Sequence, residues 1–396
     1  MSDLHRPKHV PAFLIWGGWY GSRNIGDDAI LLGLKELILR VNRGRDVYIR
    51  ALTTDADQTA ALGVTGEPAL VKHEAVKPWA WLRVLRTFAR ADRVIVSGGT
   101  PVFDSSHAIR TLYLSLPLLF RTPFVVFGAG VKPLESGYGR RVVPRLLRRA
   151  TYISVRDDDS LRILTELGVP NVHLTADSAF FALPSSDSAV THLLAEYGIG
   201  GEESLLVVSP RLLSPERKRL YLQEAMGESL IRETPARLAR AIDHLAPRFG
   251  RVVVMAMHFH GPDSDVPIIR EIMARVKGKN VVFIDRELTP DIAIGLFKRA
   301  RIVLAVRLHA LLLSASMGTP VVGVAYEQKV RSLFGVLGVD EYCHDLFTLD
   351  ADALAASVER ALENENALRG HLKERVTALR ERVLASAHAA LRLSGP

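Results

Sequence analysis

The sequence predicts an α/β protein built from two Rossmann-like domains. Short runs rich in Val and Ile alternate along the chain with helical stretches of ten or more residues. These runs lack a clean apolar–polar alternation, as expected for parallel strands that are covered on both faces. With 396 residues, the chain is long for one hydrophobic core and suits two domains of ordinary size.

Eleven segments have strand character, six in the first half of the chain and five in the second. The predicted strands are 11–16, 46–52, 93–97, 123–128, 152–155, 172–175, 204–208, 251–256, 281–284, 301–305 and 320–324. Pro117, Arg121 and Pro123 interrupt the apolar run at 111–127, which we interpret as a helix followed by a strand.

Ser, Pro and Gly cluster between 182 and 203, where strand character is lost, so we place the domain boundary there. The predicted domains are 1–185 and 200–350, and they are followed by C-terminal helices over 351–396, where apolar residues recur at steps of three or four. Two such domains predict a cleft between the carboxyl ends of two sheets, where ligands of open α/β sheets bind.

The charge of the chain is positive and uneven. It carries 51 Lys or Arg and 43 Asp or Glu, a net charge of +8, and residues 1–190 hold 24 and 18 of these, a net charge of +6. A basic first half indicates an anionic partner, namely nucleic acid, a phosphorylated substrate or a membrane surface. Solvated arginine in an Arg-rich sequence explains it equally well. Without a zinc-knuckle spacing, an RNP motif or a basic tail, we expect no nucleic-acid binding.

The compartment can also be predicted. A single cysteine, Cys343, excludes an internal disulfide framework and fits a reducing environment. The apolar run near the N-terminus is too short for a signal sequence or a membrane span. We therefore expect a cytoplasmic protein. Segment 79–93 is a basic amphipathic helix that either packs on the sheet, which we favour, or makes a weak peripheral contact with the inner membrane face.

Three predicted strands of the first half end in glycine, within "WGGWYGSRNIGDD", "SGGTPVFD" and "FGAGVKP". Glycines such as Gly18, Gly98 and Gly99 let the backbone approach a ligand, and a helix N-terminus offers free N–H groups to an anion. Asp27, at the start of the predicted helix, is either an N-cap or a site carboxylate. The spacing is not G-x-G-x-x-G, and no Walker lysine follows.

Basic residues follow three other strands. Arg156 comes directly after a buried strand, and the aspartates at 157–159 behind it suit helix capping. Arg307 and His309 stand at a strand-to-helix switch, and Lys329 follows the next strand. A guanidinium binds carboxylate or phosphate with two hydrogen bonds, and histidine exchanges protons near neutral pH. Solvated or capping basic residues are the alternative interpretation.

One loop, "HFHGPDSD" at 258–265, contains two histidines and two aspartates after a predicted strand. The H-x-H-x-x-D-x-D pattern on one loop is a weak metal signature, and we expect no metal site there.

Six stretches occur in a fixed order, namely "GGWYGSRNIGDDAIL", "SGGTPVFD", "FGAGVKPL", "ISVRDDDSLRIL", "TADSAF" and "RLHALLLSASMGTPVVGVAYEQKV". Together they resemble the polysaccharide pyruvyl transferase family over residues 13–340. The resemblance implies a GT-B-like fold whose two domains face each other across a cleft. It also implies transfer of the pyruvyl group of phosphoenolpyruvate to two sugar hydroxyls as a ketal. Members of the family modify cell-wall and capsular glycans, and the donor is a substrate, so we expect no cofactor.

The resemblance carries the family's functional residues over to Asp27, Arg156, Arg307, His309 and Lys329, and the chemistry of the donor suggests the roles of the residues. His309 would be the general acid and then base, and Asp27 would act as a base on an acceptor hydroxyl or orient the histidine. The residues expected to bind substrate are Arg307, Lys329, Arg156, Gly18, Asn24, Gly98, Gly99 and Tyr326. Two stretches depart from the family pattern, because G-G-G-x-x-Q-D is replaced by "GGTPVFD" and Y-D-x-K by "YEQK". These changes leave the acceptor open.

Other functions stay open. A GT-B glycosyltransferase with a nucleotide-sugar donor has the same architecture, and a non-catalytic sugar-phosphate binding protein would retain it. Within the enzyme class, the acceptor is a lipid-linked glycan, a polymer or a small natural product. A homodimer is as compatible with the sequence as a monomer.

Overall fold

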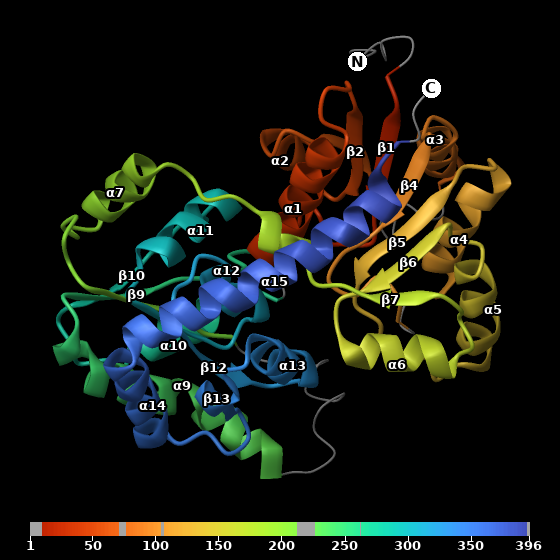
Figure 1. Cartoon of the computed structure of the whole chain (residues 1–396). Helices are drawn as coiled ribbons and strands as arrows, with labels where there is room; N and C mark the ends of the chain where they lie inside the picture. Colours follow the sequence, from red (N-terminus) through yellow and green to blue (C-terminus); the bar gives the residue numbers. More distant parts are fainter. Residues whose placement is uncertain (1–9, 71–76, 104–106, 212–225, 262, 394–396) are drawn as a thin grey trace. The chain divides into compact units, whose positions relative to one another are not determined.

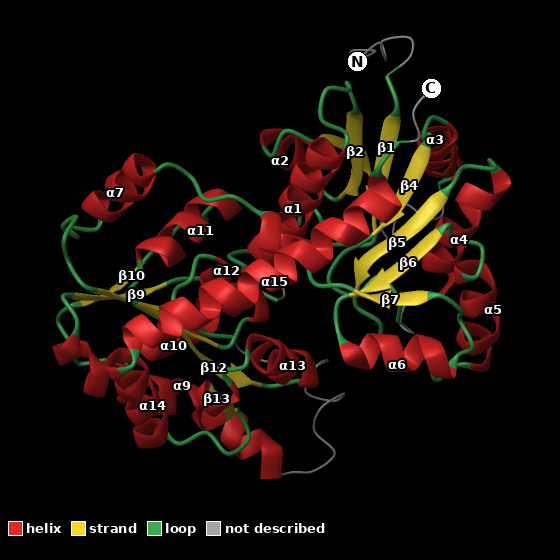
Figure 2. Ribbon diagram, in the orientation of Figure 1, coloured by secondary structure: helices red, strands yellow, loops and turns green. Residues whose placement is uncertain are grey.

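The computed structural model describes residues 10–70, 77–103, 107–211, 226–261 and 263–393. Its contacts divide the chain into two compact units. The first unit comprises Met1–Ser22, Asp27–Phe181 and Leu379–Pro396, and the second comprises Arg23–Gly26 and Ala182–Ala378. Each unit contains one parallel sheet with helices packed against it (Figures 1 and 2).

The first sheet has seven strands in the order β3-β2-β1-β4-β5-β6-β7, and every pair is parallel. The strands are β1 (Ala12–Trp16), β2 (Tyr48–Thr53), β3 (Thr65–Pro68), β4 (Arg93–Val96), β5 (Phe124–Ala129), β6 (Tyr152–Val155) and β7 (Val172–Leu174). The helices are α1 (Ile25–Val41), α2 (Ala56–Ala61), α3 (Pro78–Ala89), α4 (His107–Leu119), α5 (Gly137–Leu147), α6 (Asp158–Glu166) and the 3₁₀ turn η2 (Ser178–Phe181).

Helices α3, α4, α5 and α6 cover one face of the first sheet (Figure 1). Their inward residues, such as Val84, Leu114, Val143 and Leu164, form one apolar cluster with the strands. Helix α1 lies on the other face, and its residues are absent from this cluster. The buried strands need no apolar–polar alternation because both faces are covered.

The second sheet has six parallel strands in the order β10-β9-β8-β11-β12-β13. The strands are β8 (Leu205–Ser209), β9 (Arg251–Val254), β10 (Val281–Phe283), β11 (Ile302–Ala305), β12 (Val321–Ala325) and β13 (Cys343–Asp345). The helices are α7 (Asp187–Glu196), α9 (Met226–Leu245), α10 (Val266–Met273), α11 (Pro290–Arg299), α12 (Leu308–Ser316), α13 (Gln328–Leu337) and α14 (Ala351–Glu363), with 3₁₀ turns η3 (Ala246–Arg248) and η4 (Asp340–Tyr342).

Both sheets reverse their strand order at one point. The first reverses between β1 and β4, and the second between β8 and β11. Helices before and after such a point lie on opposite faces, which leaves a crevice at the carboxyl ends of the two strands, where ligands of this fold bind. The loops after β1, β4, β8 and β11 are therefore the places to search for a site.

The long helix α15 (Glu365–Leu391) ends the described chain, and its last part belongs to the first unit. Asn42 donates to the carbonyl of Leu391 at 3.1 Å, and Arg93 donates to Ala390 at 2.6 Å. These contacts bind the last turn of α15 to β4 and to the residue that follows α1 in the first unit.

The α/β prediction is confirmed, and all eleven predicted strands are present within one or two residues. Two strands, β3 and β13, were missed, because each is a short edge strand without a Val- or Ile-rich run. The helical interpretation of the C-terminal region is also confirmed. Within the described part of the chain, no helix has the length and apolar character needed to cross a bilayer.

Candidate functional site

Two buried arginines stand at the strand-order reversal of the second unit. Arg211 lies two residues beyond β8, and Arg307, the N-cap residue of α12, lies two residues beyond β11. They are 7% and 5% exposed. Since β8 and β11 are paired neighbours, the topology brings these two guanidinium groups to the same crevice.

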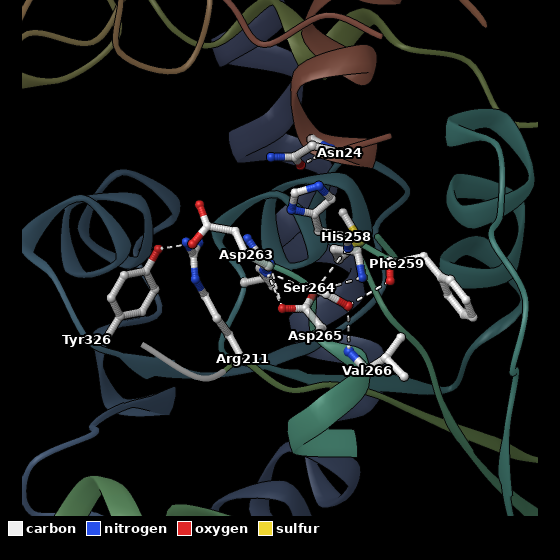
Figure 3. Close-up of polar contacts among 12 residues, drawn as sticks. Asn24, Arg211, His258, Phe259, Asp263, Ser264, Asp265, Val266 and Tyr326 are labelled. Atoms are coloured by element: carbon white, nitrogen blue, oxygen red, sulfur yellow. Dashed lines mark hydrogen bonds and ion pairs between the residues drawn. The ribbon is translucent and has the colours of Figure 1, made fainter. Parts of the chain in front are cut away.

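Asp265 holds Arg307 in place. Nε of Arg307 lies 2.9 Å from each carboxylate oxygen, and Nη2 lies 2.5 Å from Oδ1 and 2.9 Å from the carbonyl of Asp263. The fully buried carboxylate also accepts the backbone amides of Met257 and His258 (Figure 3). The Nε–Nη2 edge is thus occupied, and Nη1 has no recorded partner among the described residues. A ligand would meet Nη1.

Arg211 is held by Tyr326. Its Nη1 donates to the phenol oxygen at 2.9 Å, and its guanidinium lies 5.0 Å from the ring centroid (Figure 3). Burial raises the pKa of Tyr326, and Glu327 adds to this effect. The phenol is therefore neutral at physiological pH and orients Arg211 as an acceptor and an aromatic surface.

The electrostatics of the arginine pair favour an anion. Burial lowers the pKa of Arg307, and the positive charge of Arg211 lowers it further, despite the opposing effect of Asp265. Burial also lowers the pKa of Arg211, but Tyr326 and the carboxylates of Asp265, Glu327 and Asp263 outweigh it, so the pKa of Arg211 is raised. Of the two guanidinium groups, Arg307 is therefore the one whose charge an added anion would stabilise. This crevice therefore suits a phosphate or carboxylate.

Lys329 is the second residue of α13 and adds a third cation at the end of β12. Its ammonium forms an ion pair with Glu327 and lies 5.9 Å from the ring centroid of Tyr326. Its side chain is 26% exposed, so it is the most accessible of the three cations.

His309 is the second residue of α12 and packs against the backbone at Gly26. A Cβ atom at position 26 would lie 2.4 Å from Nδ1 of the imidazole, which only glycine avoids. His309 of the "RLH" motif therefore meets Gly26 of the "NIGDD" motif within the second unit, to which Arg23–Gly26 belongs. The sequence showed both motifs and could not show their contact.

Asn24 caps helix α1. Its Oδ1 accepts the amide of Gly26 at 3.0 Å, and the helix begins at Ile25. Asn24 also forms an isolated antiparallel bridge with His258 (Figure 3). The prediction that the helix begins at Asp27 was therefore wrong by two residues, and Asp27 lies in the first turn instead of capping it.

Asp27 and Asp28 are both buried, at 8% and 1% exposure, yet their surroundings differ. Asp28 accepts the amide of Gly21 at 3.0 Å and the side-chain amide of Gln58 at 3.3 Å, so it fixes the glycine-rich loop after β1. Asp27 faces Gly99, where an added Cβ would lie 3.5 Å from Oδ1. Asp28 therefore has a structural role, whereas Asp27 lies beside the loop after β4.

The glycines after β1 and β4 serve close backbone packing. Gly98 has a φ of +138°, and a Cβ there would lie 2.4 Å from the amide nitrogen of Gly18. The two loops at the strand-order reversal of the first unit therefore touch through their backbones. Asp104, which ends the "GGTPVFD" motif, lies outside the described residues.

Arg156 occupies the place after β6 and is surrounded by carboxylates of its own unit. Nη1 donates to Asp177 at 2.7 Å, and Nε lies 3.6 Å from Asp157. Burial lowers the pKa of Arg156, but Asp177, Asp157 and Asp27 outweigh it, so the pKa is raised. Asp157 also caps α6 through the amide of Ser160, as the sequence predicted.

The loop that contains His258 and Asp265 holds the guanidinium of Arg307 in place. Asp265 is used by Arg307 and by two backbone amides, and His260 is 3.5 Å from Glu287. Among the described residues, no group of three or more His, Cys, Asp or Glu side chains is arranged to hold a metal ion.

The structure thus groups the predicted residues by unit. Arg307, His309, Lys329, Tyr326 and Asn24 belong to the second unit, and Asp27, Arg156, Gly18, Gly98 and Gly99 to the first. Sequence analysis missed Arg211. Arg211 could have been found from its position just beyond a strand, which matches the position of Arg307. It was overlooked because Pro210 separates it from the strand.

Solved structures place the chain in the GT-B class of folds. It is similar to a glycosyltransferase from Rickettsia africae, with a TM-score of 0.60, 9% identity and 96% of both chains covered. It is also similar to the UDP-GlcNAc 2-epimerase from Neisseria meningitidis, with a TM-score of 0.56, 12% identity and coverage of 95% of this chain and 100% of that one. At such identities the likeness concerns the fold alone.

Residues 24–328 match the model of the family described as polysaccharide pyruvyl transferase, and the chain belongs to this family. It is also 24% identical over 283 residues to the amylovoran biosynthesis protein AmsJ of Erwinia amylovora. That match covers 69% of this chain and 66% of AmsJ, slightly less than two thirds of its length.

Proposed function

We propose that this protein transfers the pyruvyl group of phosphoenolpyruvate to two hydroxyls of a sugar or glycan acceptor, as a ketal, and releases phosphate. The observation that carries the proposal is the pair of buried arginines, Arg211 and Arg307, beside His309 at one crevice. The donor carries a carboxylate and a phosphate on three carbons, so it needs several fixed cations in a small space. Membership of the family supports this donor.

In the proposed reaction, His309 protonates the methylene carbon of the donor while the first acceptor hydroxyl adds to the central carbon. Asp27 takes the proton of that hydroxyl. The C–O bond to phosphate then breaks, the second hydroxyl attacks the same carbon, and its proton leaves with the departing phosphate or through His309. Nη1 of Arg307, Arg211 and Lys329 stabilise the carboxylate and the phosphate throughout.

Arg156, which the sequence suggested as a further donor cation, has a different role in this proposal. Its positive charge is already matched by Asp177 and Asp157, and the charge of Asp27 also acts on it. We assign it to holding the carboxylates of Asp177 and Asp157 in place after β6.

The acceptor side follows from the family and the relative. A protein of amylovoran biosynthesis is similar to this chain, and the family modifies polysaccharides. We therefore propose a glycan or glycoside acceptor bound near the loops after β1 and β4, and activity in the cytoplasm. We propose no metal and no cofactor for the reaction.

Two measurements test the function. The purified protein is incubated with phosphoenolpyruvate and a panel of glycosides, and phosphate release is followed together with the mass of the product. Thermal shift is measured with phosphoenolpyruvate and with nucleotide sugars. Acceptor-dependent phosphate release with a pyruvylated product supports the proposal. Stabilisation by a nucleotide sugar alone would instead indicate a glycosyltransferase, and binding of the donor without turnover on any acceptor would indicate a sugar-phosphate binding protein.

A further inference from the structure

The positive charge of the whole chain is concentrated in one segment. Residues 77–150 contain 13 of the 51 Lys and Arg but only 3 of the 43 Asp and Glu, a net charge of +10. The rest of the chain holds 38 basic and 40 acidic residues, a net charge of −2. A basic composition spread over the surface would not give this difference, so the charge marks a particular face.

That face consists of α3, α4 and α5, the neighbouring helices on one side of the first sheet (Figure 1). No acidic residue occurs within these three helices. The exposed arginines on and beside these helices are Arg86, Arg90, Arg121, Arg140, Arg141, Arg145, Arg148 and Arg149, and no ion pair is seen for them among the described residues.

The same helices expose most of the large apolar side chains at the described surface. Of eight such residues, five lie here, namely Trp79 (63% exposed), Leu82 (47%), Leu118 (36%), Leu119 (67%) and Tyr138 (52%). Single exposed apolar residues are ordinary, but a cluster within a basic surface marks an interaction site.

Packing onto the sheet does not account for these side chains. Helix α3 turns Ala80, Val84 and Phe88 inward. Part of the predicted amphipathic helix therefore packs on the sheet, which is the alternative that the sequence analysis favoured. Trp79 and Leu82 face outward and are left over. Between α3 and α4, Leu85, Ala89, Leu119 and Phe120 line an apolar hollow, with Arg86 at its edge.

We propose that the α3–α4–α5 face docks on a bilayer that contains anionic lipids. Tryptophan, tyrosine and leucine side chains insert at the boundary between headgroups and acyl chains, while arginines extend from the same surface to lipid phosphates. The absence of acidic residues from the helices fits a surface that is negative everywhere, as a leaflet is. The docking requires no donor and no acceptor, so it stands independently of the proposed reaction.

The expected strength of membrane binding determines which variants and salt concentrations are tested. Each basic residue near an anionic membrane contributes about fivefold to partitioning, and the contribution decays within a Debye length. Reversing two arginines should therefore weaken binding by about 25-fold or more. High salt should weaken it similarly, because the Debye length falls to about 3 Å at about 1 M salt.

The experiment is co-sedimentation of the full-length protein with phosphatidylcholine vesicles, with and without phosphatidylglycerol, at low and high salt. The charge variant is Arg86→Glu/Arg145→Glu, and its matched control is Arg240→Glu/Arg275→Glu, which makes the same charge change at exposed positions of the second unit. The apolar variant is Leu119→Ser, and its control is Leu39→Ser on α1, where the side chain is 43% exposed. Circular dichroism checks that each variant is folded.

We expect the wild-type protein to pellet only with vesicles that contain phosphatidylglycerol, and only at low salt. The charge variant and the apolar variant should lose this pelleting, and both control variants should retain it. Four outcomes would overturn the proposal. The first three are that the protein does not pellet, that salt does not change its pelleting, and that the control variants lose pelleting as much as the face variants do. The fourth is that the wild type forms a dimer in solution as its concentration rises, whereas Leu119→Ser stays a monomer. The last result would make the face a contact between two copies of the chain.

Discussion

Arg156 and Arg307 occupy equivalent places in the two units, and their environments are opposite. Each follows the carboxyl end of a buried strand and precedes a helix, and each side chain is about as buried as the other, at 7% and 6% exposure. Carboxylates raise the pKa of Arg156 in spite of burial, whereas burial and Arg211 lower the pKa of Arg307 in spite of Asp265.

This difference indicates which of the two units is suited to bind a phosphate or carboxylate. The first unit already surrounds its arginine with negative charge, so a phosphate there would be repelled by Asp27, Asp157 and Asp177. In the second unit the pKa of Arg307 is lowered, and a phosphate or carboxylate beside it would stabilise its charge. We therefore propose that the donor binds in the second unit.

The largest effect is expected at His309. His309→Ala should fold and lose transfer by about a hundred- to ten-thousand-fold, because general acid–base catalysis contributes that much. His260→Ala, which changes an exposed histidine paired with Glu287, is the control and should leave the rate near wild type. Steady-state phosphate release is the measurement. A His309→Ala rate within a few-fold of wild type would remove His309 from the mechanism.

Variants of the neighbouring residues Asp27 and Asp28 distinguish a catalytic carboxylate from a structural one in the first unit. Asp27→Asn should lower kcat about a hundredfold or more, because it removes the base. Asp28→Asn keeps an acceptor for the amide of Gly21 and should stay within a few-fold of wild type. Both rates are measured beside the melting temperature. Equal losses of rate in the two variants would show that Asp27, like Asp28, only supports the loop.

The comparison of the two arginines is tested by the same substitution in each unit. Arg307→Lys should raise the donor KM by about ten- to a hundredfold, because an ammonium cannot hold Asp265 and also reach the donor, and a charged hydrogen bond contributes about 1.5–3 kcal/mol. Arg156→Lys should change kcat or the acceptor KM and leave the donor KM within a few-fold. An unchanged donor KM in Arg307→Lys, or a large rise in Arg156→Lys, would contradict the placement of the donor in the second unit.

The smallest expected effect is that of a chelator. Activity should persist in EDTA, because the His258–Asp265 loop commits Asp265 to Arg307. The measurement is the rate before and after exhaustive chelation. Loss of activity that zinc or magnesium restores would contradict the proposed mechanism.

Local patterns were enough to predict most of the fold. Strands such as β8 and β11 are Val- and Leu-rich runs followed by helical periodicity, and this order alone implies parallel sheets. Helix boundaries were less secure, because the start of α1 depends on the cap made by Asn24, one of several residues nearby that can accept a hydrogen bond. The edge strands β3 and β13 are fixed by their pairing partners instead of by their own composition.

By itself, the sequence determined the fold class and singled out Arg307, His309, Asp27 and Arg156, because strand ends and motif order are visible in the chain. Only the tertiary structure decided what surrounds each of them. Arg211 and Asp265 lie 96 and 42 residues from Arg307 in sequence, and Asp177 lies 21 from Arg156, so their charges meet only when the strands pair. Electrostatic interaction depends on distance and burial in space, and the order of residues does not contain either.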